Sequence, residues 1–435
     1  KNLYANIRLK LQNISTPLVS QLKKVSAGGA QQLRWGGNDL FWNVKVGRPA
    51  GGSFSTSGWF PPDTTALERQ ARVGVKRAYV TRMIDGLALV GTQSKAMAFE
   101  TILSKTYDEI KSALFLLQQG AFHNKADGVL ALTNGTMASA LPLVVAYPYG
   151  LGTAGTIATS VGQGALLLSP GDYVAVLDTS AADAVIGRAQ IASIAMSGDL
   201  ATLTFVSPGI TGFATVAAGD KIVRATTTDT SFGAATNGLI SIMNRGGSYN
   251  DLHGINAATA GNEIWNTVRM TAGTDTPDAN TPTEDDLWVL AQRISGLSGK
   301  SPLTNPDQWL LLTTPGLQQK FIQNLAALRR FDSASFTKKV NGGYNAVSIS
   351  GMDCIADYYV PAGTVYLIHK PSLGLVDGKD AGYVEFEGAG PWRWVTGRDA
   401  FETTYSWYGE LATLARNAHG MIVGYADTMR YSHVI

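Results

Sequence analysis

The sequence predicts an α+β fold made of several units, and three features carry this prediction. Two strand-like segments flank a long turn within the first 86 residues, and one long amphipathic helix follows them. Residues 136–236 then form a turn-rich stretch with few charges. With 435 residues, the chain has the length of about three domains.

The composition is that of a globular chain. Hydrophobic residues make up 45% of it and the formal net charge is +2, whereas disordered chains combine low hydrophobicity with high net charge. The charged fraction of 16% is low against a usual value of about 25%, and the chain has 48 glycines. These values favour a β-rich chain with many turns, or a surface that other copies of the chain cover.

Cysteine content and hydropathy limit the class of protein further. Cys354 is the one cysteine, which excludes an internal disulfide framework and a Cys-based zinc site, and we expect it to be a small buried residue. No run of 18 apolar residues and no signal peptide is visible, so a transmembrane helix is not expected. The sequence begins at Lys1, so we expect that an upstream segment is cleaved or that the sequence starts late.

The first 86 residues are interpreted as an arm and a hairpin. Residues 1–38 look irregular, with at most one short helix. Polar and apolar side chains alternate on both sides of a stretch rich in Gly, Ser and Pro, and in the second strand Val73, Val75 and Tyr79 are set among basic residues. Residues 39–86 are therefore predicted to form an extended β-hairpin. Because the hairpin has no obvious core of its own, we expect it to project.

The clearest helix is predicted over residues 93–119, within a unit that spans 87–135. Ser94 can cap its start, and Gly120 ends it. Apolar residues recur at spacings of three and four, as they do on one face of a helix: Phe99, Leu103, Tyr107, Ile110, Leu114 and Leu117.

Residues 136–236 differ from the rest in composition. They carry nine charges in 101 positions, and short strand-like runs alternate with Gly, Pro and Asp turns. This spacing predicts a small β-barrel or sandwich. Since the composition changes again after residue 236, we interpret the stretch as an inserted module.

Helices and strands mix from residue 237 onward. Thr283 precedes three acidic residues, which indicates the start of a helix. The segment QWLLLTTPG is typical of a short buried strand, and the helix predicted after it has Leu317 and Phe321 on one face.

The net charge hides an asymmetry along the chain. Residues 1–82 hold 13 Lys and Arg but three acidic residues, so their net charge is +10, and the remainder carries −8. Three interpretations stay open: an arm that binds nucleic acid, an arm that lies on the acidic body of a neighbouring copy, and an ordinary solvated surface. The basic residues are spread out with no run of three, which favours contact with protein.

None of the common catalytic signatures is present. Ile294 stands where a phosphate-binding loop over GLSGKS would need its first glycine, and Asp285 with Asp286 is better explained by the start of a helix. The histidines lie far apart without metal-binding spacing, so each is expected to be structural: His123, His253, His369, His419 and His433.

The order of these elements resembles the major capsid protein of tailed bacteriophages, with the Johnson-type (Hong Kong ninety-seven type) fold. In that family an N-terminal arm precedes a long hairpin, the E-loop, and then a spine helix, a peripheral (P) domain and an axial (A) domain. QSKAMAFETILSKTYDEIKSALFLLQQG looks like the spine helix. The resemblance implies this division: arm 1–38, E-loop 39–86, P domain with spine helix 87–135, inserted all-β module 136–236, A domain 237–395, and closing P-domain strands 396–435.

The resemblance also implies a function. It is that of a head shell protein that self-assembles into pentamers and hexamers of an icosahedral phage head around double-stranded DNA. The implied partners are other copies of the chain, portal, scaffold or protease and decoration proteins, and packaged DNA through non-specific contact. The resemblance implies no enzymatic activity, no cofactor, no metal and no membrane contact. It implies that the protein is part of the virion and that it assembles in the bacterial cytoplasm.

Two alternatives differ from this interpretation. An encapsulin nanocompartment would have the same fold, but the length and the inserted module argue against it. A β-rich glycan-binding or surface enzyme domain would use exposed Trp and Tyr as sugar platforms.

Contact between subunits is predicted at the hairpin and arm. Trp59 and Phe60 stand side by side before two prolines at the tip, where they are expected to insert into an apolar patch of a neighbouring subunit or, alternatively, to fold back on their own. Four basic residues are expected to meet acidic surfaces of neighbours: Arg48, Arg69, Arg72 and Lys76.

Overall fold

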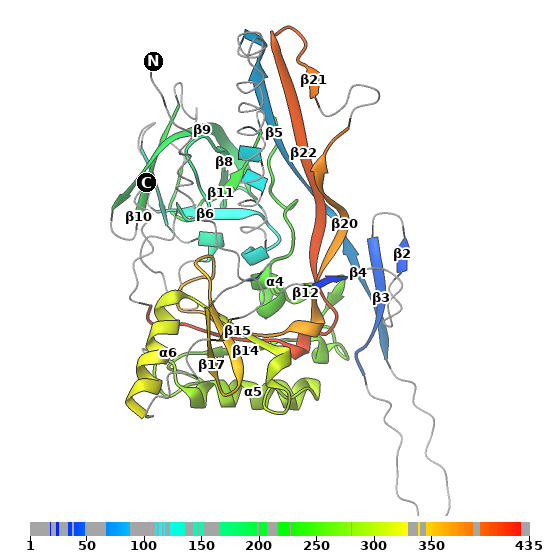
Figure 1. Ribbon diagram of the computed structural model, residues 1–435, viewed down its shortest axis with the longest axis vertical. Coiled ribbons are helices and arrows are strands. Elements are labelled where there is room, and N and C mark those ends of the chain that lie inside the picture. Colours follow the sequence, from blue (N-terminus) through cyan, green and yellow to red (C-terminus); the bar gives the residue numbers. More distant parts are fainter. Residues whose placement is uncertain are drawn as a thin grey trace, which may run out of the picture.

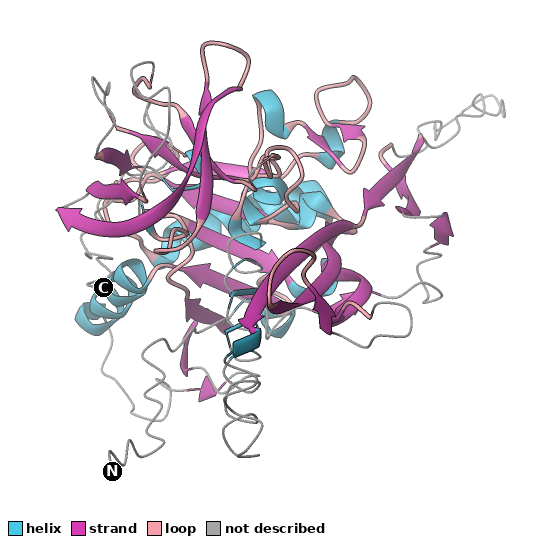
Figure 2. Ribbon diagram, turned by 90° about the horizontal axis from the view of Figure 1, so that it is seen from above, coloured by secondary structure: helices cyan, strands magenta, loops and turns pink. Residues whose placement is uncertain are grey.

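The computed structural model describes residues 18, 23–25, 34–36, 39–47, 67–87, 106, 109–110, 113–114, 117, 122–134, 142–146, 148–151, 165–197, 200–206, 216–226, 228–279, 281–328, 338–339, 345–385 and 392–427. Three large bodies dominate them: a seven-stranded sheet with two helices, a closed barrel, and a long narrow sheet that rises beside the barrel (Figure 1). Figure 2 shows the same bodies from above.

The predicted hairpin is formed by two strands of a three-stranded sheet. This sheet has the order β2-β3-β4, with β2 at Arg34–Gly36, β3 at Asp39–Lys45 and β4 at Glu68–Gly74. Strands β3 and β4 pair antiparallel, from Asp39 opposite Gly74 to Lys45 opposite Glu68. The segment that joins them, 48–66, lies outside the described residues.

Strand β5 (Lys76–Asp85) leaves the hairpin and enters the long sheet. It pairs antiparallel with β22 (Ala400–Thr413), from Lys76 opposite Gly409 to Asp85 opposite Ala400. On its other side, β22 pairs with β20 (Leu373–Tyr383) and β21 (Trp392–Trp394). Strand β1 (Lys23–Val25) completes the sheet beside β20.

The barrel closes in the order β10-β7-β6-β11-β8-β9. The strands are β6 (Val129–Thr133), β7 (Leu143–Ala146), β8 (Tyr173–Asp178), β9 (Ala184–Ser197), β10 (Leu200–Phe205) and β11 (Lys221–Arg224). Strand β6 precedes residue 136, where the sequence placed the start of the module. All five β6 residues are buried, and the strand lies before the turn-rich stretch with few charges that marked the module.

The seven-stranded sheet has the order β14-β23-β19-β15-β18-β17-β16. Its strands are β14 (Val268–Thr271), β15 (Trp309–Thr313), β16 (Lys338–Lys339), β17 (Asn345–Ile349), β18 (Met352–Ala356), β19 (Val365–His369) and β23 (Gly420–Val423). Helices α5 (Glu284–Ser298) and α6 (Pro315–Leu328) pack on it. Short elements complete the described chain: α4 (Leu239–Met243), β12 (Asp251–Leu252), β13 (Ile255–Asn256), η1 (Pro148–Gly150), η4 (Gly247–Tyr249), η5 (Glu263–Trp265), η6 (Pro306–Gln308), η8 (Lys370–Ser372) and η9 (Arg416–Ala418).

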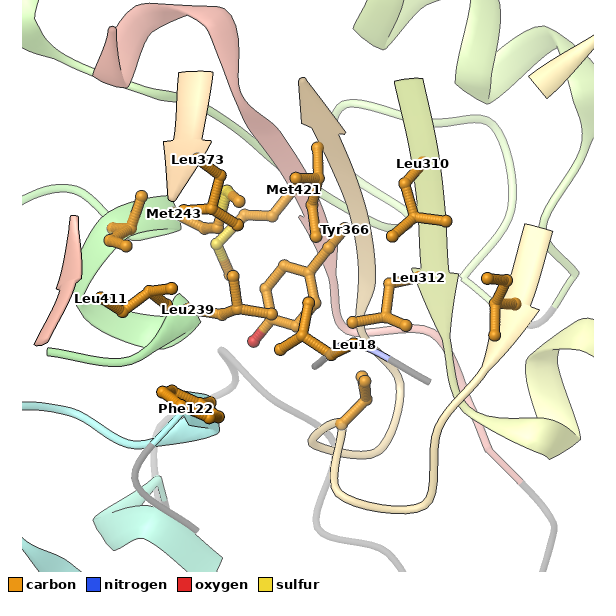
Figure 3. Packing of buried hydrophobic residues seen from close by; sticks show 14 of the residues in the cluster. Leu18, Phe122, Leu239, Met243, Leu310, Leu312, Tyr366, Leu373, Leu411 and Met421 are labelled. Atoms are coloured by element: carbon orange, nitrogen blue, oxygen red, sulfur yellow. The ribbon is translucent and has the colours of Figure 1, made fainter. Parts of the chain in front are cut away.

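The main core lies against both faces of this sheet. Strand β15 is buried along its whole length, as its unbroken apolar sequence predicted. Because side chains alternate along a strand, Trp309 and Leu311 face α5 and α6, whereas Leu310 and Leu312 face α4 and the long sheet. Figure 3 shows the cluster on the face that carries Leu310 and Leu312, in which Tyr366 lies among Leu239, Leu312 and Met421.

The predicted long helix is described at few positions. Thr106, Glu109, Ile110, Ala113, Leu114 and Leu117 are helical. Ile110 and Leu114 are buried in the main core, and Leu117 packs against it. The apolar face is thus confirmed at these three positions, and Phe99, Leu103 and Tyr107 lie outside the described residues.

Helix α5 begins as the sequence predicted. Thr283 accepts a hydrogen bond from the Asp286 backbone N–H, and the Asp286 carboxylate accepts one from the Thr283 backbone N–H, which makes a capping box. Gly299 ends the helix with φ +72°, so the GLSGKS segment is the end of a helix and not a phosphate-binding loop.

The chain crosses from one sheet to the other at η9. Strand β22 belongs to the long sheet, but β23 lies inside the seven-stranded sheet between β14 and β19, so the strands within 396–435 do not form one unit. Arg416 stands at the crossing with its side chain buried. Its guanidinium donates to five backbone carbonyls, those of Ser241, Ile242, Asn244, Tyr249 and Asn250.

Candidate functional site

The paired strands of the hairpin pack against their own chain. Four hairpin side chains are buried with residues of the β12–η5 region: Leu40, Trp42, Ala71 and Val73 against Ile255, Ala257 and Trp265. The backbone N–H of Arg72 also donates to the His253 carbonyl at 2.9 Å. The expectation that the hairpin has no core is therefore wrong for these strands, because one face of each covers the base of the long sheet.

Two of the predicted contact residues have partners in their own chain. Arg72 Nε donates to Asp39 Oδ2 at 2.7 Å, and its guanidinium lies 5.8 Å from the centre of the Phe41 ring. Arg69 Nε donates to Asn262 Oδ1 at 3.2 Å. Because a guanidinium has five N–H donors, each arginine keeps donors for a further partner.

Of the remaining predicted contact residues, one is described by the structure and three are not. Lys76 is partly buried at the start of β5, opposite Gly409 of β22. Arg48, Trp59 and Phe60 lie outside the described residues, so their roles stay predictions.

The long sheet exposes apolar side chains that the sequence did not assign to contacts between subunits. The exposed fractions are 47% for Tyr79, 54% for Met83, 73% for Leu87 and 54% for Trp394. The first three lie on or just after β5, and the fourth lies on β21, which pairs with the other edge of β22. Met83 lies opposite Glu402 and Trp394 opposite Phe401, so these two side chains project from opposite faces of the sheet.

The alternation of buried side chains changes register between β4 and β5. In β4 the buried residues are Ala71 and Val73, but in β5 they are Ala78 and Ile84. The strand is interrupted at Val75, and the two parts pack on different sheets. Tyr79 therefore points away from the face that Val73 occupies in the alternating pattern, and this break is invisible in a continuous pattern of period two.

Side-chain contacts hold the exposed groups in fixed positions. The Tyr79 and Tyr408 rings meet edge to face at 5.8 Å, and their hydroxyl oxygens lie 3.1 Å apart. That hydrogen bond is the main reason why the pKa of Tyr79 is raised. Arg77 lies 5.7 Å from the centre of the Tyr408 ring. Such fixed aromatic groups lose little entropy when a partner covers them.

The tip of the sheet is organised in the same way. Trp394 meets Phe401 edge to face at 4.9 Å, and Arg393 forms an ion pair with Glu402. Both contacts join β21 to β22, so the exposed Trp394 ring is anchored on one side and open on the other. The arrangement suits docking of another surface.

The four described histidines are buried, as expected of structural residues. The His369 backbone N–H donates to His419 Nδ1 at 3.2 Å, and the Thr413 N–H donates to His253 Nε2 at 3.3 Å. Burial is the main cause that lowers the pKa of His253 and His419 to about 3 and that of His369 to about 4. These rings are neutral at pH 7.

The remaining reactive groups are also enclosed. His123 Nε2 lies 3.2 Å from Asp357 Oδ2, and neither side chain is exposed. Cys354 is fully buried, as predicted, and burial raises the pKa of its thiol to about 12. Within the described ranges, no three His, Cys, Asp or Glu side chains are grouped so that they could hold a metal ion. No described helix is long and apolar enough to cross a bilayer.

No protein-family model and no curated protein matches the sequence. Solved structures do match the fold. The capsid asymmetric unit of cyanophage A-1(L) matches at 9% identity, covering 94% of this chain and 93% of that chain, with a TM-score of 0.50. The capsid of a native GTA particle matches at 8% identity over 98% and 100% of the two chains, with a TM-score of 0.44. An encapsulin complex from Synechococcus elongatus matches at 14% identity over 38% and 56%, with a TM-score of 0.28.

The cyanophage match shows a shared fold over nearly the whole of both chains. The protein is thus a strand-rich α+β chain with a phage capsid fold, which confirms at the level of the fold the resemblance to the Hong Kong ninety-seven type. The two matches with lower TM-scores support no further argument.

Proposed function

We propose that this chain is the major capsid protein of a tailed bacteriophage, which assembles into pentamers and hexamers of an icosahedral head around double-stranded DNA. The observation that carries the proposal is the fold likeness to a phage capsid subunit over 94% of the chain. A likeness of that extent includes the barrel as well as the two sheets. The partial encapsulin match gives no reason to prefer a nanocompartment.

The exposed end of the long sheet supports assembly on physical grounds. Tyr79, Met83, Leu87 and Trp394 would be an aggregation hazard if water covered them permanently. In a shell, contacts between subunits would bury them. The low charged fraction of 16% fits a chain whose surface is largely covered by copies of itself.

The finer assignments belong to the same proposal. The arm is 1–38, the E-loop 39–86, the P domain with the spine helix 87–135, the inserted module 136–236, and the A domain 237–395. Residues 396–435 would contribute to both domains, because β22 and β23 lie in different sheets. Portal, scaffold or protease, and decoration proteins would be the partners, with non-specific contact to DNA, in a virion assembled in the bacterial cytoplasm. No enzymatic step is part of the proposal.

The hairpin would supply subunit contacts through its tip and its cations. Trp59→Ala should leave the melting of the isolated subunit nearly unchanged and lower the stability of shells in denaturant, since Trp anchors dominate interfaces. Equal destabilisation of the isolated subunit would place the tip in its own core. Charge reversal at Arg48, Arg69, Arg72 and Lys76 should block assembly, and part of that effect would come from the contacts of Arg69 and Arg72 within the chain.

Electron microscopy of the purified, recombinant chain tests the proposal directly. We expect closed particles of uniform size that elute in the megadalton range. Persistent monomers over a range of salt and protein concentrations would overturn it. Particles that retain a bacterial enzyme as cargo would favour the nanocompartment, and binding on a glycan array without particles would favour a surface domain.

A further inference from the structure

One face of strands β5 and β22 is exposed and has a regular order of side chains. Side chains of β5 alternate between two faces, and Ala78 and Ile84 lie on the buried one. The other face of β5 carries exposed residues in the order cation, ring, hydroxyl, thioether and carboxylate: Arg77, Tyr79, Thr81, Met83 and Asp85. Strand β22 runs beside β5 along this whole stretch (Figure 1). We call this surface, which has opposite charges at its two ends, the β5–β22 face.

Strand β22 supplies the second row of the β5–β22 face. Each exposed residue of β5 has one neighbour there: Tyr408 opposite Arg77, Ser406 opposite Tyr79, Thr404 opposite Thr81, Glu402 opposite Met83 and Ala400 opposite Asp85. The largest neighbour, Tyr408, thus lies at the cationic end, and the smallest, Ala400, lies at the acidic end. The Arg77 guanidinium lies 5.7 Å from the centre of the Tyr408 ring, and the Thr81 and Thr404 hydroxyl oxygens lie 3.1 Å apart. These contacts order the face before any partner binds.

The order of side chains makes the β5–β22 face complementary to itself. A two-fold axis that lies between two such faces and crosses the strands at Thr81 would lay β5 over an antiparallel copy of itself. Arg77 would then meet Asp85 of the second copy, and Tyr79 would meet Met83 of the second copy. Each of these encounters would occur twice, because such an interface repeats every residue pair. A guanidinium with a carboxylate and a ring with a thioether are both favourable pairs.

The residues of β22 fit the same arrangement. Tyr408 of one copy would lie over Ala400 of the other, so a large side chain would meet a small one, and Thr404 would lie at the axis. Facing sheets pack about 10 Å apart when their side chains interdigitate in this way. An axis that ran along the strands would instead place Arg77 against Arg77 of the second copy. Charge and volume therefore both favour the antiparallel arrangement.

We propose that the β5–β22 face binds the same face of a second copy of this chain across a two-fold axis. The inference rests on the proposed function, because an icosahedral shell contains two-fold axes at which identical surfaces meet. Tyr79 and Met83, which are 47% and 54% exposed, become buried near the centre of the contact. A second copy fits better than a nucleic acid, because a phosphate backbone would meet the carboxylates of Asp85 and Glu402.

Cross-linking at the axis tests the contact. Thr81→Cys places one thiol of each copy at the axis, and the native Cys354 is fully buried. A short bismaleimide, which spans the gap of about 10 Å between facing sheets, is added to shells, and the dimer is measured on a denaturing gel. Arg82→Cys is the matched control, since Arg82 is exposed on the opposite face of the same strand. We expect at least about tenfold more dimer from Thr81→Cys, because only residues at a two-fold axis meet their own copy. Equal yields, or no dimer, would overturn the inference.

Charge reversal gives an independent test and separates the contact from folding. Arg77→Glu and Asp85→Arg should each raise the subunit concentration needed for assembly at least about tenfold, because each brings like charges together twice, with a nearly unchanged melting curve of the subunit. The double variant restores opposite charges across the axis and should return to within about threefold of the wild type. Normal assembly of both single variants, or a double variant no better than they are, would overturn the inference while leaving the proposed function intact. Failure of the wild type to form particles would overturn both.

Discussion

The seven-stranded sheet and the far end of the long sheet use the same kind of residue in opposite ways. Strand β15 buries every side chain between two apolar clusters. Strand β5 buries Ala78 and Ile84 but leaves Tyr79 and Met83 in water. The apolar side chains of the first region are all buried within one chain. The second region has similar apolar side chains, but no other part of the described chain covers them. This difference separates what stabilises the subunit from what is available for assembly.

The largest expected effect is acid destabilisation at the histidines near the crossing between the two sheets. The pKa of His253 and His419 is about 3 and that of His369 about 4 in the folded chain. Below pH 6.5 these histidines are therefore protonated in the unfolded chain but stay neutral in the folded chain. The free energy of unfolding should fall by about 1.4 kcal/mol per pH unit and histidine as the pH drops from 6.5 towards these values. Urea unfolding of subunits at several pH values measures the slope.

His253→Gln is the matched variant for this slope. It should be less stable at pH 7 and should lose about one third of the acid dependence, because one of three buried rings is gone. A slope that stays the same would disprove the contribution of His253 to the response to acid.

The next largest effect is expected in the complete region. Leu311→Ala removes a side chain that is fully buried against α5 and α6, and it should lower the free energy of unfolding of the subunit by about 2–5 kcal/mol. Denaturant titration of the unassembled subunit measures it. A loss below about 1 kcal/mol would show that the sheet collapses around the gap and is less rigid than its packing implies.

A smaller effect of opposite sign is expected at Glu410, on the buried part of β22. Burial raises the pKa of this carboxyl well above its ordinary value, and its Oε2 has no partner within the described residues. Above pH 4.5 the Glu410 carboxyl ionises in the unfolded chain but stays protonated in the folded chain. The free energy of unfolding of the wild type should therefore fall by about 1.4 kcal/mol per pH unit until the folded-state pKa is reached. Glu410→Gln should match the wild type near pH 4 and exceed it at pH 7. A constant difference between the two proteins would disprove a raised pKa.

The smallest effect on the subunit is expected at the open end of the long sheet. Met83→Gln combined with Leu87→Gln should change the free energy of unfolding by less than about 0.5 kcal/mol, since both side chains are exposed. The same variant should need a higher protein concentration to assemble, as light scattering can measure. Val206→Gln, which changes an exposed residue next to β10 of the barrel, is the control. Assembly equal to the wild type would remove this end from the contact surfaces.

Local signals in the sequence predicted the complete region well. The capping box at Thr283, the buried strand QWLLLTTPG and the burial of Cys354 all depend on neighbours in the chain or on a residue's own hydrophobicity. The paired strands of the hairpin were predicted for the same reason. These elements would be recognisable in any chain with this pattern.

Pairing between distant segments was not predictable in the same way. The pattern of period two runs through Val75 without a break, although β4 and β5 pack on different sheets. Likewise, β23 joins β14 and β19, and nothing in its short apolar run distinguishes it from a strand of the long sheet. The sequence analysis placed Tyr79 in the alternating pattern without a role of its own, and it did not consider Met83.

The clamp at Arg416 has a mechanical consequence. Strand β22 has 14 residues, about 45 Å at the usual rise per residue, and its open end pairs with β5 and β21, which carry exposed groups. Its other end runs into η9, where five hydrogen bonds fix Arg416 to the segment 241–250. A strand held rigidly at one end and pushed at the other behaves as a lever. A force applied at Trp394 would therefore be transmitted to the segment 241–250 and to the seven-stranded sheet, because Arg416 prevents bending at this point.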